Sequence, residues 1–316
     1  MKKLLALLLG ALLVLSVGAV AEEGHTVAYL SASTTTPFWN WVETGITDAC
    51  AERGWELIVY NSAEDSATQL KNTQNAITRG VDAIIISPVD SASCPAVLDE
   101  AESYGIPVVI CDIGTEEGTY LSFIMTPNYN GSYEVGAYLG QYLKDNGLSG
   151  TICMIDVPLS RINGQLRYEG FATALKEYGF SVDQVLESET FTLDEADGQA
   201  RNLITAHSDI VAIYAAHSQA TLGVVAAIED LGLDGKILVC SFDGDPETAD
   251  YLQSGKVLVC GAQQAKKMGR ESLYVLDDSF AGKEISDTIE IPTFTLTSEN
   301  VMNYLDVIDK DICGLE

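Results

Sequence analysis

Short apolar runs alternate along the chain with stretches whose apolar residues recur at helical spacing. The first set of runs predicts buried strands at residues 26–30, 56–60, 83–87, 108–112 and 121–125. The stretches between them carry apolar side chains three or four positions apart, as at Phe38, Val42, Ile46 and Ala49. This alternation predicts βαβ units, and hence a parallel sheet with helices on both faces.

The same rhythm begins again after Gly150. It predicts strands at 151–155, 182–187, 210–215, 237–242 and 257–261, with helices at about 163–178, 195–207, 218–231 and 246–254. Two similar five-strand halves indicate an α/β protein with two lobes of like architecture. A further amphipathic stretch at 266–280 follows the second half and needs a sheet to cover.

Ligands of open parallel sheets bind beyond the carboxyl ends of the strands. This rule selects the segments that directly follow the predicted strands as the place to look for functional side chains. They are residues 31–39, 87–90, 112–113, 126–128, 216–218, 242–245 and 261–264.

An aromatic pair follows the first predicted strand. Thr36 suits a helix N-cap and Pro37 the first helical position, which places Phe38 and Trp39 on the first turn. Aromatic faces pack well against the C–H faces of sugar rings. Both rings could instead enter the core. Neighbouring helical positions point about 100° apart, so one ring can face the core and the other a ligand.

Two aspartates end strands at matching places in the two halves, Asp112 and Asp243. A carboxylate accepts two hydroxyl hydrogen bonds at once, and such charged bonds contribute roughly 1.5–3 kcal/mol each. Either residue alone could be a helix N-cap. Their equivalent positions favour a ligand that bridges the two lobes.

The N-terminus has the pattern of a secretory signal peptide. Lys2 and Lys3 precede an apolar run at residues 4–17, and an Ala-Val-Ala site ends at Ala21. A retained membrane anchor is the alternative, but the run is short for a span that needs about 20 residues. We expect cleavage after Ala21 and export to the periplasm or cell envelope. No cysteine near this site offers an acceptor for a lipid.

Removal of residues 1–21 leaves 15 basic and 46 acidic residues, a net charge of −31. Such a field repels phosphate backbones, which argues against a nucleic-acid partner. Seven cysteines show no zinc-binding spacing, and several lie inside apolar runs as small core residues. A disulfide between Cys240 and Cys260 stays open as an alternative.

Motifs of common enzyme classes are absent from the sequence. There is no dinucleotide-binding or triphosphate-binding glycine loop and no nucleophile elbow. The three histidines, His25, His207 and His217, are too scattered to suggest a metal cluster. We therefore predict no catalytic set, no metal and no cofactor.

Seven short segments give the chain a family resemblance from about residue 25 to residue 290. They are TPFW (36–39), IISPVD (85–90), GIPVVICD (105–112), RYEGF (167–171), LITAH (203–207), SFDG (241–244) and AQ (262–263). In this order and spacing they resemble the type I periplasmic sugar-binding proteins, especially the ribose-binding branch.

The resemblance implies two Rossmann-like lobes joined by a three-segment hinge, with a sugar bound between them. The N-terminal lobe would contain residues 25–125 and 264–291, and the C-terminal lobe residues 126–263 and 292–316. By position in the family motifs, stacking aromatics would be Phe38, Trp39 and Phe191, hydroxyl-binding carboxylates Asp112 and Asp243, and the hinge glutamine Gln263. Thr36, Gln165 and His217 occupy ligand-binding positions where the ribose branch usually has Asn, Arg and Asn.

Ile113 also replaces an expected arginine, so two cationic partners of the carboxylates are missing. Uncompensated buried charge is costly. Protonated His217, nearby Arg167 or a positively charged ligand could each supply the compensation. We expect a neutral sugar or cyclitol, with an amino-bearing ligand or a furanosyl signal as alternatives.

The resemblance implies a monomeric, non-enzymatic binding protein that delivers its ligand to the permease subunits of an ABC transporter. A sensory module for a chemoreceptor or histidine kinase, and a secreted enzyme on a related scaffold, are the rival functions. A sugar-responsive repressor is disfavoured by the export signal and by the lack of DNA-binding helices.

Overall fold

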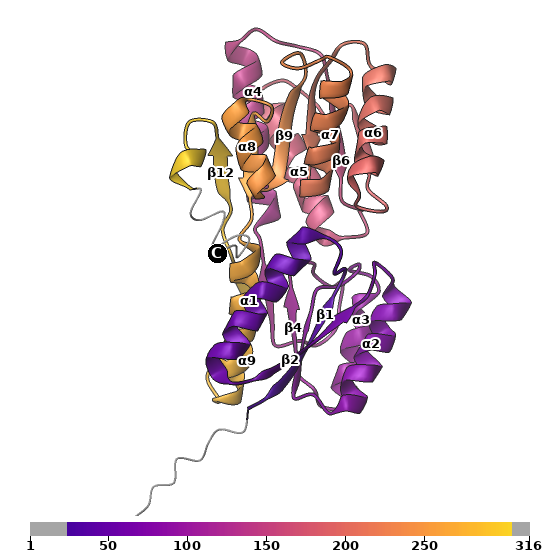
Figure 1. Ribbon diagram of the computed structural model, residues 1–316, viewed down its shortest axis with the longest axis vertical. Helices are drawn as coiled ribbons and strands as arrows, with labels where there is room; N and C mark the ends of the chain where they lie inside the picture. Colours follow the sequence, from indigo (N-terminus) through magenta and orange to yellow (C-terminus); the bar gives the residue numbers. More distant parts are fainter. Residues whose placement is uncertain (1–23, 305–316) are drawn as a thin grey trace, which may run out of the picture.

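The computed structural model describes residues 24–304 as two lobes stacked along the long axis of the molecule (Figure 1). The N-terminal lobe contains a parallel sheet in the order β11-β5-β4-β3-β1-β2. Its strands are β1 (Thr26–Ser31), β2 (Glu56–Asn61), β3 (Ala83–Ile86), β4 (Val108–Cys111), β5 (Ser122–Met125) and β11 (Thr288–Glu290). Its helices are α1 (Pro37–Arg53), α2 (Ser66–Arg79), α3 (Cys94–Ser103) and α9 (Ala265–Phe280).

The C-terminal lobe has a sheet in the order β12-β10-β9-β8-β6-β7, in which only β12 is antiparallel to its neighbour. Its strands are β6 (Thr151–Asp156), β7 (Gln184–Glu187), β8 (Ile210–Ala215), β9 (Leu238–Asp243), β10 (Val259–Ala262) and β12 (Phe294–Thr297). Its helices are α4 (Asn128–Asp145), α5 (Ile162–Glu177), α6 (Leu193–Ala206), α7 (Ser218–Asp230), α8 (Pro246–Ser254) and the short 3-10 helix η1 (Val301–Asn303).

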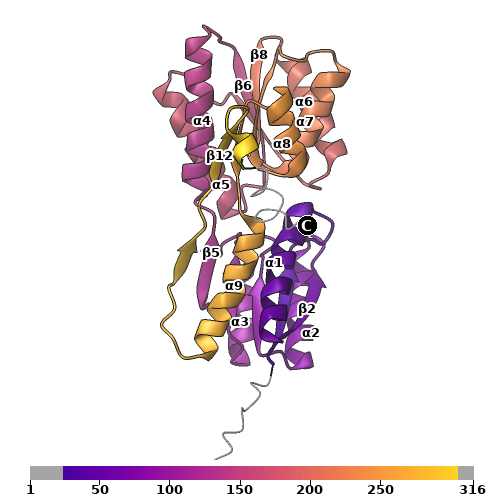
Figure 2. The same ribbon diagram turned by 60° about the vertical axis from the view of Figure 1, so that its left-hand side comes forward.

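Within residues 24–304 the chain crosses between the lobes after β5, after β10 and after β11. In Figure 2 these crossings gather on one side of the molecule. The lobes also touch elsewhere, because Trp41 of α1 packs against hydrophobic clusters of both. Apart from the added strands, the two sheets share the order 2-1-3-4-5 of doubly wound folds, which confirms the predicted fold class.

Helices cover both faces of each sheet, which explains the continuous apolar runs in the sequence. In the N-terminal lobe α1 and α9 cover one face and α2 and α3 the other. In the C-terminal lobe α4 and α5 lie opposite α6, α7 and α8. A strand such as β3, buried along its whole length, needs no polar alternation.

Four elements were not predicted from the sequence: α4, β11, β12 and the short 3-10 helix η1. Helix α4 contains Gly131, Gly136 and Gly140, which are weak helix formers, although Val135, Leu139 and Leu143 repeat at helical spacing. Strand β12 pairs with β10, about 35 positions earlier, so its stability depends on a distant partner. The domain boundaries proposed from the family resemblance stay a prediction.

The described cysteines, Cys50, Cys94, Cys111, Cys153, Cys240 and Cys260, are all buried and free. The alternative of a disulfide between Cys240 and Cys260 is therefore wrong. Cys313, the proposed signal peptide at 1–21 and the C-terminal tail lie outside the described residues. No helix within residues 24–304 is long and apolar enough to span a bilayer.

Gly269 lets α9 lie directly against α1. A Cβ atom at this position would stand 2.0 Å from the carbonyl oxygen of Val42. We expect Gly269→Ala to lower the free energy of unfolding by about 1–3 kcal/mol, because the two backbones must separate. Denaturant unfolding monitored by circular dichroism measures this change.

Gly198 is the matched control, because a Cβ there meets no atom within 4 Å and the residue lies inside α6. Gly198→Ala should stabilise the protein by about 0.5–1 kcal/mol through helix propensity alone. Equal effects of the two substitutions would contradict the close approach of α1 and α9.

Candidate functional site

The carboxyl ends of both sheets face each other and enclose a cavity between the lobes, here called the cleft cavity. Eight of the nine predicted site residues line it: Thr36, Phe38, Trp39, Asp112, Phe191, His217, Asp243 and Gln263. Seven further residues complete the wall: Pro37, Val157, Arg161, Asn163, Arg167, Ser218 and Gln219. The strand-end rule therefore located the cavity correctly.

Gln165 is the predicted site residue that the structure places elsewhere. Its side-chain amide is exposed and donates to the carbonyl oxygen of Leu159 at 2.7 Å. Asn163 and Arg167, four positions apart on α5, face the cavity instead. Gln165 lies about 200° around the helix from Asn163, so it points away. The placement of Gln165 at the site, which came from the family motif, is therefore wrong for this structure.

Asn163 and Arg167 could have been found from the sequence. They are in phase with the buried residues Gly170, Phe171 and Ala174 of the same helix. Polar side chains on the apolar face of a helix are unusual unless they have buried partners or line a site. This phase relation is the signal that sequence reasoning missed.

The aromatic side chains come from both lobes. Thr36 is the N-cap residue of α1 and Pro37 its first residue, as predicted, but the Thr36 side chain makes no capping hydrogen bond. Phe38 and Trp39 are both buried and both line the cavity, with ring centroids 4.9 Å apart in an edge-to-face arrangement. Both rings also belong to the hydrophobic core of the N-terminal lobe, so the two do not divide into one core ring and one ligand-facing ring. Phe191 faces them from the C-terminal lobe.

Asp243 is held by polar groups of its own lobe. Its Oδ2 accepts from the backbone N–H of Ser218 at 3.0 Å, and its Oδ1 accepts from Gln263 Nε2 at 2.7 Å. Arg167 Nη1 lies 3.7 Å from Oδ1. The N-cap of the following helix α8 is Asp245, so the N-cap alternative for Asp243 does not hold.

Asp112 contrasts with Asp243 because half of its carboxylate has no partner. Oδ2 accepts from Asn163 Nδ2 at 3.3 Å, whereas Oδ1 is buried and accepts no hydrogen bond from residues 24–304. No helix begins directly after it. Burial raises the pKa of Asp112 to about 6; Arg167 and Arg161 oppose this rise, and Asp243 adds to it.

Gln263 offers a second unpartnered acceptor in the cleft. Its Nε2 is committed to Asp243, and its Oε1 is buried without a donor in the described part of the chain. Buried polar atoms rarely stay unpaired in folded proteins. Asp112 Oδ1 and Gln263 Oε1 therefore both call for hydrogen-bond donors of the kind that hydroxyl groups supply.

His217 is neutral in this arrangement. Its Nδ1 accepts from the backbone N–H of Ala220 at 3.3 Å, so Nε2 carries the proton and donates to Ser188 Oγ at 2.7 Å. Burial lowers the pKa of His217 to about 4. The alternative that protonated His217 compensates the carboxylates is therefore wrong.

Arg167 supplies the compensation that the sequence left open. It is 2% exposed and donates to Asn128 Oδ1 at 2.8 Å and to the Ala216 carbonyl oxygen at 2.6 Å. Its guanidinium stacks over the ring of Phe242 with a 4.3 Å distance to the centroid. Arg167 therefore packs against Phe242 and also balances the charge of Asp243.

Three residues in left-handed backbone conformations line the cavity although none is glycine. They are Asp112, Phe191 and Asp243, with φ angles of 73°, 53° and 85°. Such conformations cost about 1–3 kcal/mol each and persist where the surroundings impose them, often at functional sites. Their concentration around one cavity supports its choice as the site.

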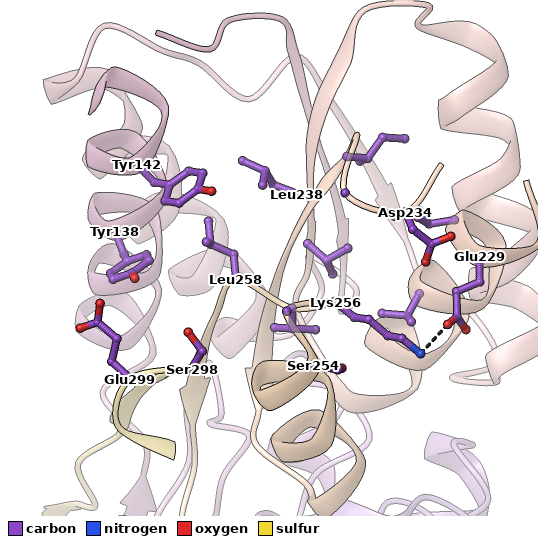
Figure 3. A pocket seen from close by; sticks show the side chains of 17 residues that line it. Tyr138, Tyr142, Glu229, Asp234, Leu238, Ser254, Lys256, Leu258, Ser298 and Glu299 are labelled. Carbon is purple, nitrogen blue, oxygen red and sulfur yellow. Dashed lines mark ion pairs between the residues drawn. The ribbon is translucent and has the colours of Figure 1, made fainter. Parts of the chain in front are cut away.

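A larger cavity of about 670 Å³ lies at the amino ends of the strands of the C-terminal sheet, away from the cleft (Figure 3). Tyr138 and Tyr142 of α4 border it on one side, and the ion pair between Lys256 and Glu229 on the other. It lies where β9 and β10 begin, and no buried unpartnered side-chain atom of the described residues lines it. Chemistry therefore favours the smaller cleft cavity.

The chain matches the family model described as periplasmic binding protein domain over residues 27–284. It is 28% identical to the ribose import binding protein of Haemophilus influenzae, with 92% of this chain and 98% of that protein covered. It is also 28% identical to the ribose import binding protein of Bacillus subtilis, with coverage of 86% and 87%.

A solved structure shows the same fold at lower identity. The carbohydrate transporter solute binding protein from Agrobacterium radiobacter, in complex with D-arabinose, superposes with a TM-score of 0.84 at 23% identity. The match covers 92% of this chain and 99% of that one.

Proposed function

The chain belongs to the periplasmic binding protein family, and on that premise we propose that it captures a neutral monosaccharide or cyclitol and delivers it to an ABC transporter. The observation that carries the proposal is the pair of unpartnered acceptors, Asp112 Oδ1 and Gln263 Oε1. They lie in a cavity bordered by aromatic rings of both lobes. A small polyhydroxylated ring supplies both features that this wall needs: its hydroxyl groups donate hydrogen bonds, and its C–H faces are apolar.

Charge balance favours a neutral ligand over an amino sugar. Arg167 lies beside Asp243, and Arg161 also lines the cavity. Arg167 already compensates Asp243, and both guanidinium groups limit the rise in the pKa of Asp112, so a ligand ammonium group would add a further cation beside them. Neutral His217 has no charge to offer an anionic ligand. The names of the related ribose import proteins agree with this chemistry.

The proposal includes the route and the partner. Residues 1–21 would direct export and be removed, and the monomeric protein would close around its sugar by a hinge motion. The closed lobes would then present a joint surface to the permease subunits. The related proteins are named for import rather than for a reaction, which supports binding without catalysis.

Isothermal titration calorimetry with a panel of ligands tests the proposal. The panel contains ribose, arabinose, allose, galactose, myo-inositol and glucosamine. We expect one or more neutral members to bind at micromolar concentration or below, which corresponds to about −8 kcal/mol. Binding of glucosamine alone would contradict the charge argument, and the absence of heat from every member of the panel would count against the function.

Affinity should fall in acid because of Asp112. Ligand hydroxyls donate to the ionised carboxylate, so binding lowers its pKa below the value of about 6 in the free protein. Protons therefore compete with the sugar below that pH, and affinity at about pH 5 should be roughly tenfold weaker than at about pH 7.5. His217, with a pKa of about 4, does not titrate in this range.

Titration calorimetry at several pH values measures this dependence. Asp112→Asn is the control, since its affinity should not vary between these two pH values. Affinity that rises toward acid would show that the protonated carboxyl is the form that binds.

A further inference from the structure

Four consecutive residues of the C-terminal lobe, Ser160 to Asn163, join it to the N-terminal lobe across the cleft. The Ser160 carbonyl oxygen accepts from the Ser91 backbone N–H at 3.3 Å, and the Ile162 backbone N–H donates to Ser91 Oγ at 3.1 Å. Asn163 bonds to Asp112 across the same gap. This segment, here called the clasp, comprises the end of the β6–α5 loop and the first two residues of α5, and it borders the cleft cavity.

Arg161 makes the strongest contacts of the clasp. Its Nε donates to the carbonyl oxygen of Val89 at 2.8 Å, and its Nη2 pairs with Glu64. The Arg161 side chain is 6% exposed and that of Glu64 21%. A buried pair with an added backbone hydrogen bond holds its geometry far better than a surface ion pair does.

The same guanidinium is also part of the ligand cavity. Arg161 lines it, and its Cζ lies 4.7 Å from the centroid of the Phe191 ring. Phe191 and Glu64, the contacts of Arg161 in the two lobes, both have left-handed φ angles, 53° and 57°. Both residues that contact Arg161 thus have strained backbone conformations, which indicates that the surrounding structure imposes this contact.

We propose that Arg161 is a positioning residue that couples an occupied cleft to closure of the lobes. A ligand against Phe191 fixes the face on which the guanidinium stacks, and the fixed guanidinium then holds Val89 and Glu64 of the other lobe. The inference rests on the proposed function, since it requires a ligand in the cleft. Glu64 neutralises Arg161, which keeps the coupling independent of ligand charge.

The clasp should act on release of the ligand rather than on its capture. A ligand enters before the lobes close, at a stage when Arg161 cannot yet reach Val89 or Glu64. Arg161→Met keeps the apolar stem and removes these bonds. We expect its dissociation rate constant to rise about tenfold or more while the association rate constant stays within about twofold of wild type.

Stopped-flow fluorescence measures both rate constants, because Trp39 lines the cavity. Arg161→Lys keeps the charge but loses the planar donor group, so it should give an intermediate dissociation rate. Arg79→Met is the matched control, since Arg79 forms a surface pair with Glu56 in which both side chains are about 60% exposed. Circular dichroism confirms that each variant is folded.

An unchanged dissociation rate in folded Arg161→Met would overturn the inference, and so would a loss confined to the association rate. Failure of every panel sugar to bind the wild type would count against the proposed function instead. In that event spin-label distances between the lobes of the full chain test the clasp without ligand. The closed fraction should be smaller in Arg161→Met than in wild type, and equal distance distributions would overturn the clasp.

Discussion

Replacing Arg167 with methionine is expected to lower the free energy of unfolding by about 3–5 kcal/mol and to abolish sugar binding. The substitution leaves the Ala216 carbonyl oxygen and Asn128 Oδ1 without their donor. It also removes the cation beside Asp243, inside a wall that water reaches poorly. Denaturant unfolding and calorimetry of the same preparation measure the two losses.

Two further variants make this result specific. Arg167→Lys retains a charge but cannot reproduce both hydrogen bonds and the stacking on Phe242, so it should recover only part of the stability. Arg79→Met, at an exposed pair, should change stability by less than about 0.5 kcal/mol. A loss below about 1 kcal/mol for Arg167→Met would show that the carboxylates do not depend on Arg167.

Asp112→Asn is expected to stabilise the free protein and weaken it as a receptor. The raised pKa of about 6 means that the ionised carboxylate is a burden in the folded state. The favourable contribution of Asp112 is present below its unfolded pKa of 3.8 and is lost as the pH rises through about 6. At about pH 7.5 the variant should therefore gain roughly 1–3 kcal/mol in unfolding free energy.

Sugar affinity of the same variant should fall by roughly 10- to 100-fold, because a neutral amide replaces the charged acceptor. Asparagine tolerates the left-handed φ of 73° at this position, which limits backbone effects. Thermal unfolding and calorimetry at about pH 7.5 and about pH 4.5 provide the comparison. A variant that lost both stability and affinity would contradict the view that the ionised carboxylate of Asp112 lowers stability and strengthens sugar binding.

The fold was predictable because ten of the twelve strands of the described residues and most helices carry a local pattern. Helix α8 was predicted at its observed bounds, and β8 likewise, since apolar periodicity and caps mark their ends. Strands β11 and β12 were not, because they lie outside the two repeating halves and pair with strands far away in the sequence. Their positions follow from tertiary structure rather than from local sequence.

The candidate site was predictable where a strand end fixes a residue and less so where a helix does. Asp112 and Asp243 follow buried runs, so topology alone brings them to one cavity. Gln165 was misplaced because a shift of two positions reverses the direction in which a helical side chain points. The neutral state of His217 and the contacts of Arg161 depend on atoms of distant segments and could not be inferred from spacing.

A crystal structure of the protein with a neutral sugar from the panel tests the central claim most directly. The account predicts the sugar ring between the aromatic side chains of the two lobes, with hydroxyl groups donating to Asp112 Oδ1 and Gln263 Oε1. A sugar bound in the larger cavity beside Tyr138 and Tyr142, with these two oxygens still unpartnered, would contradict it.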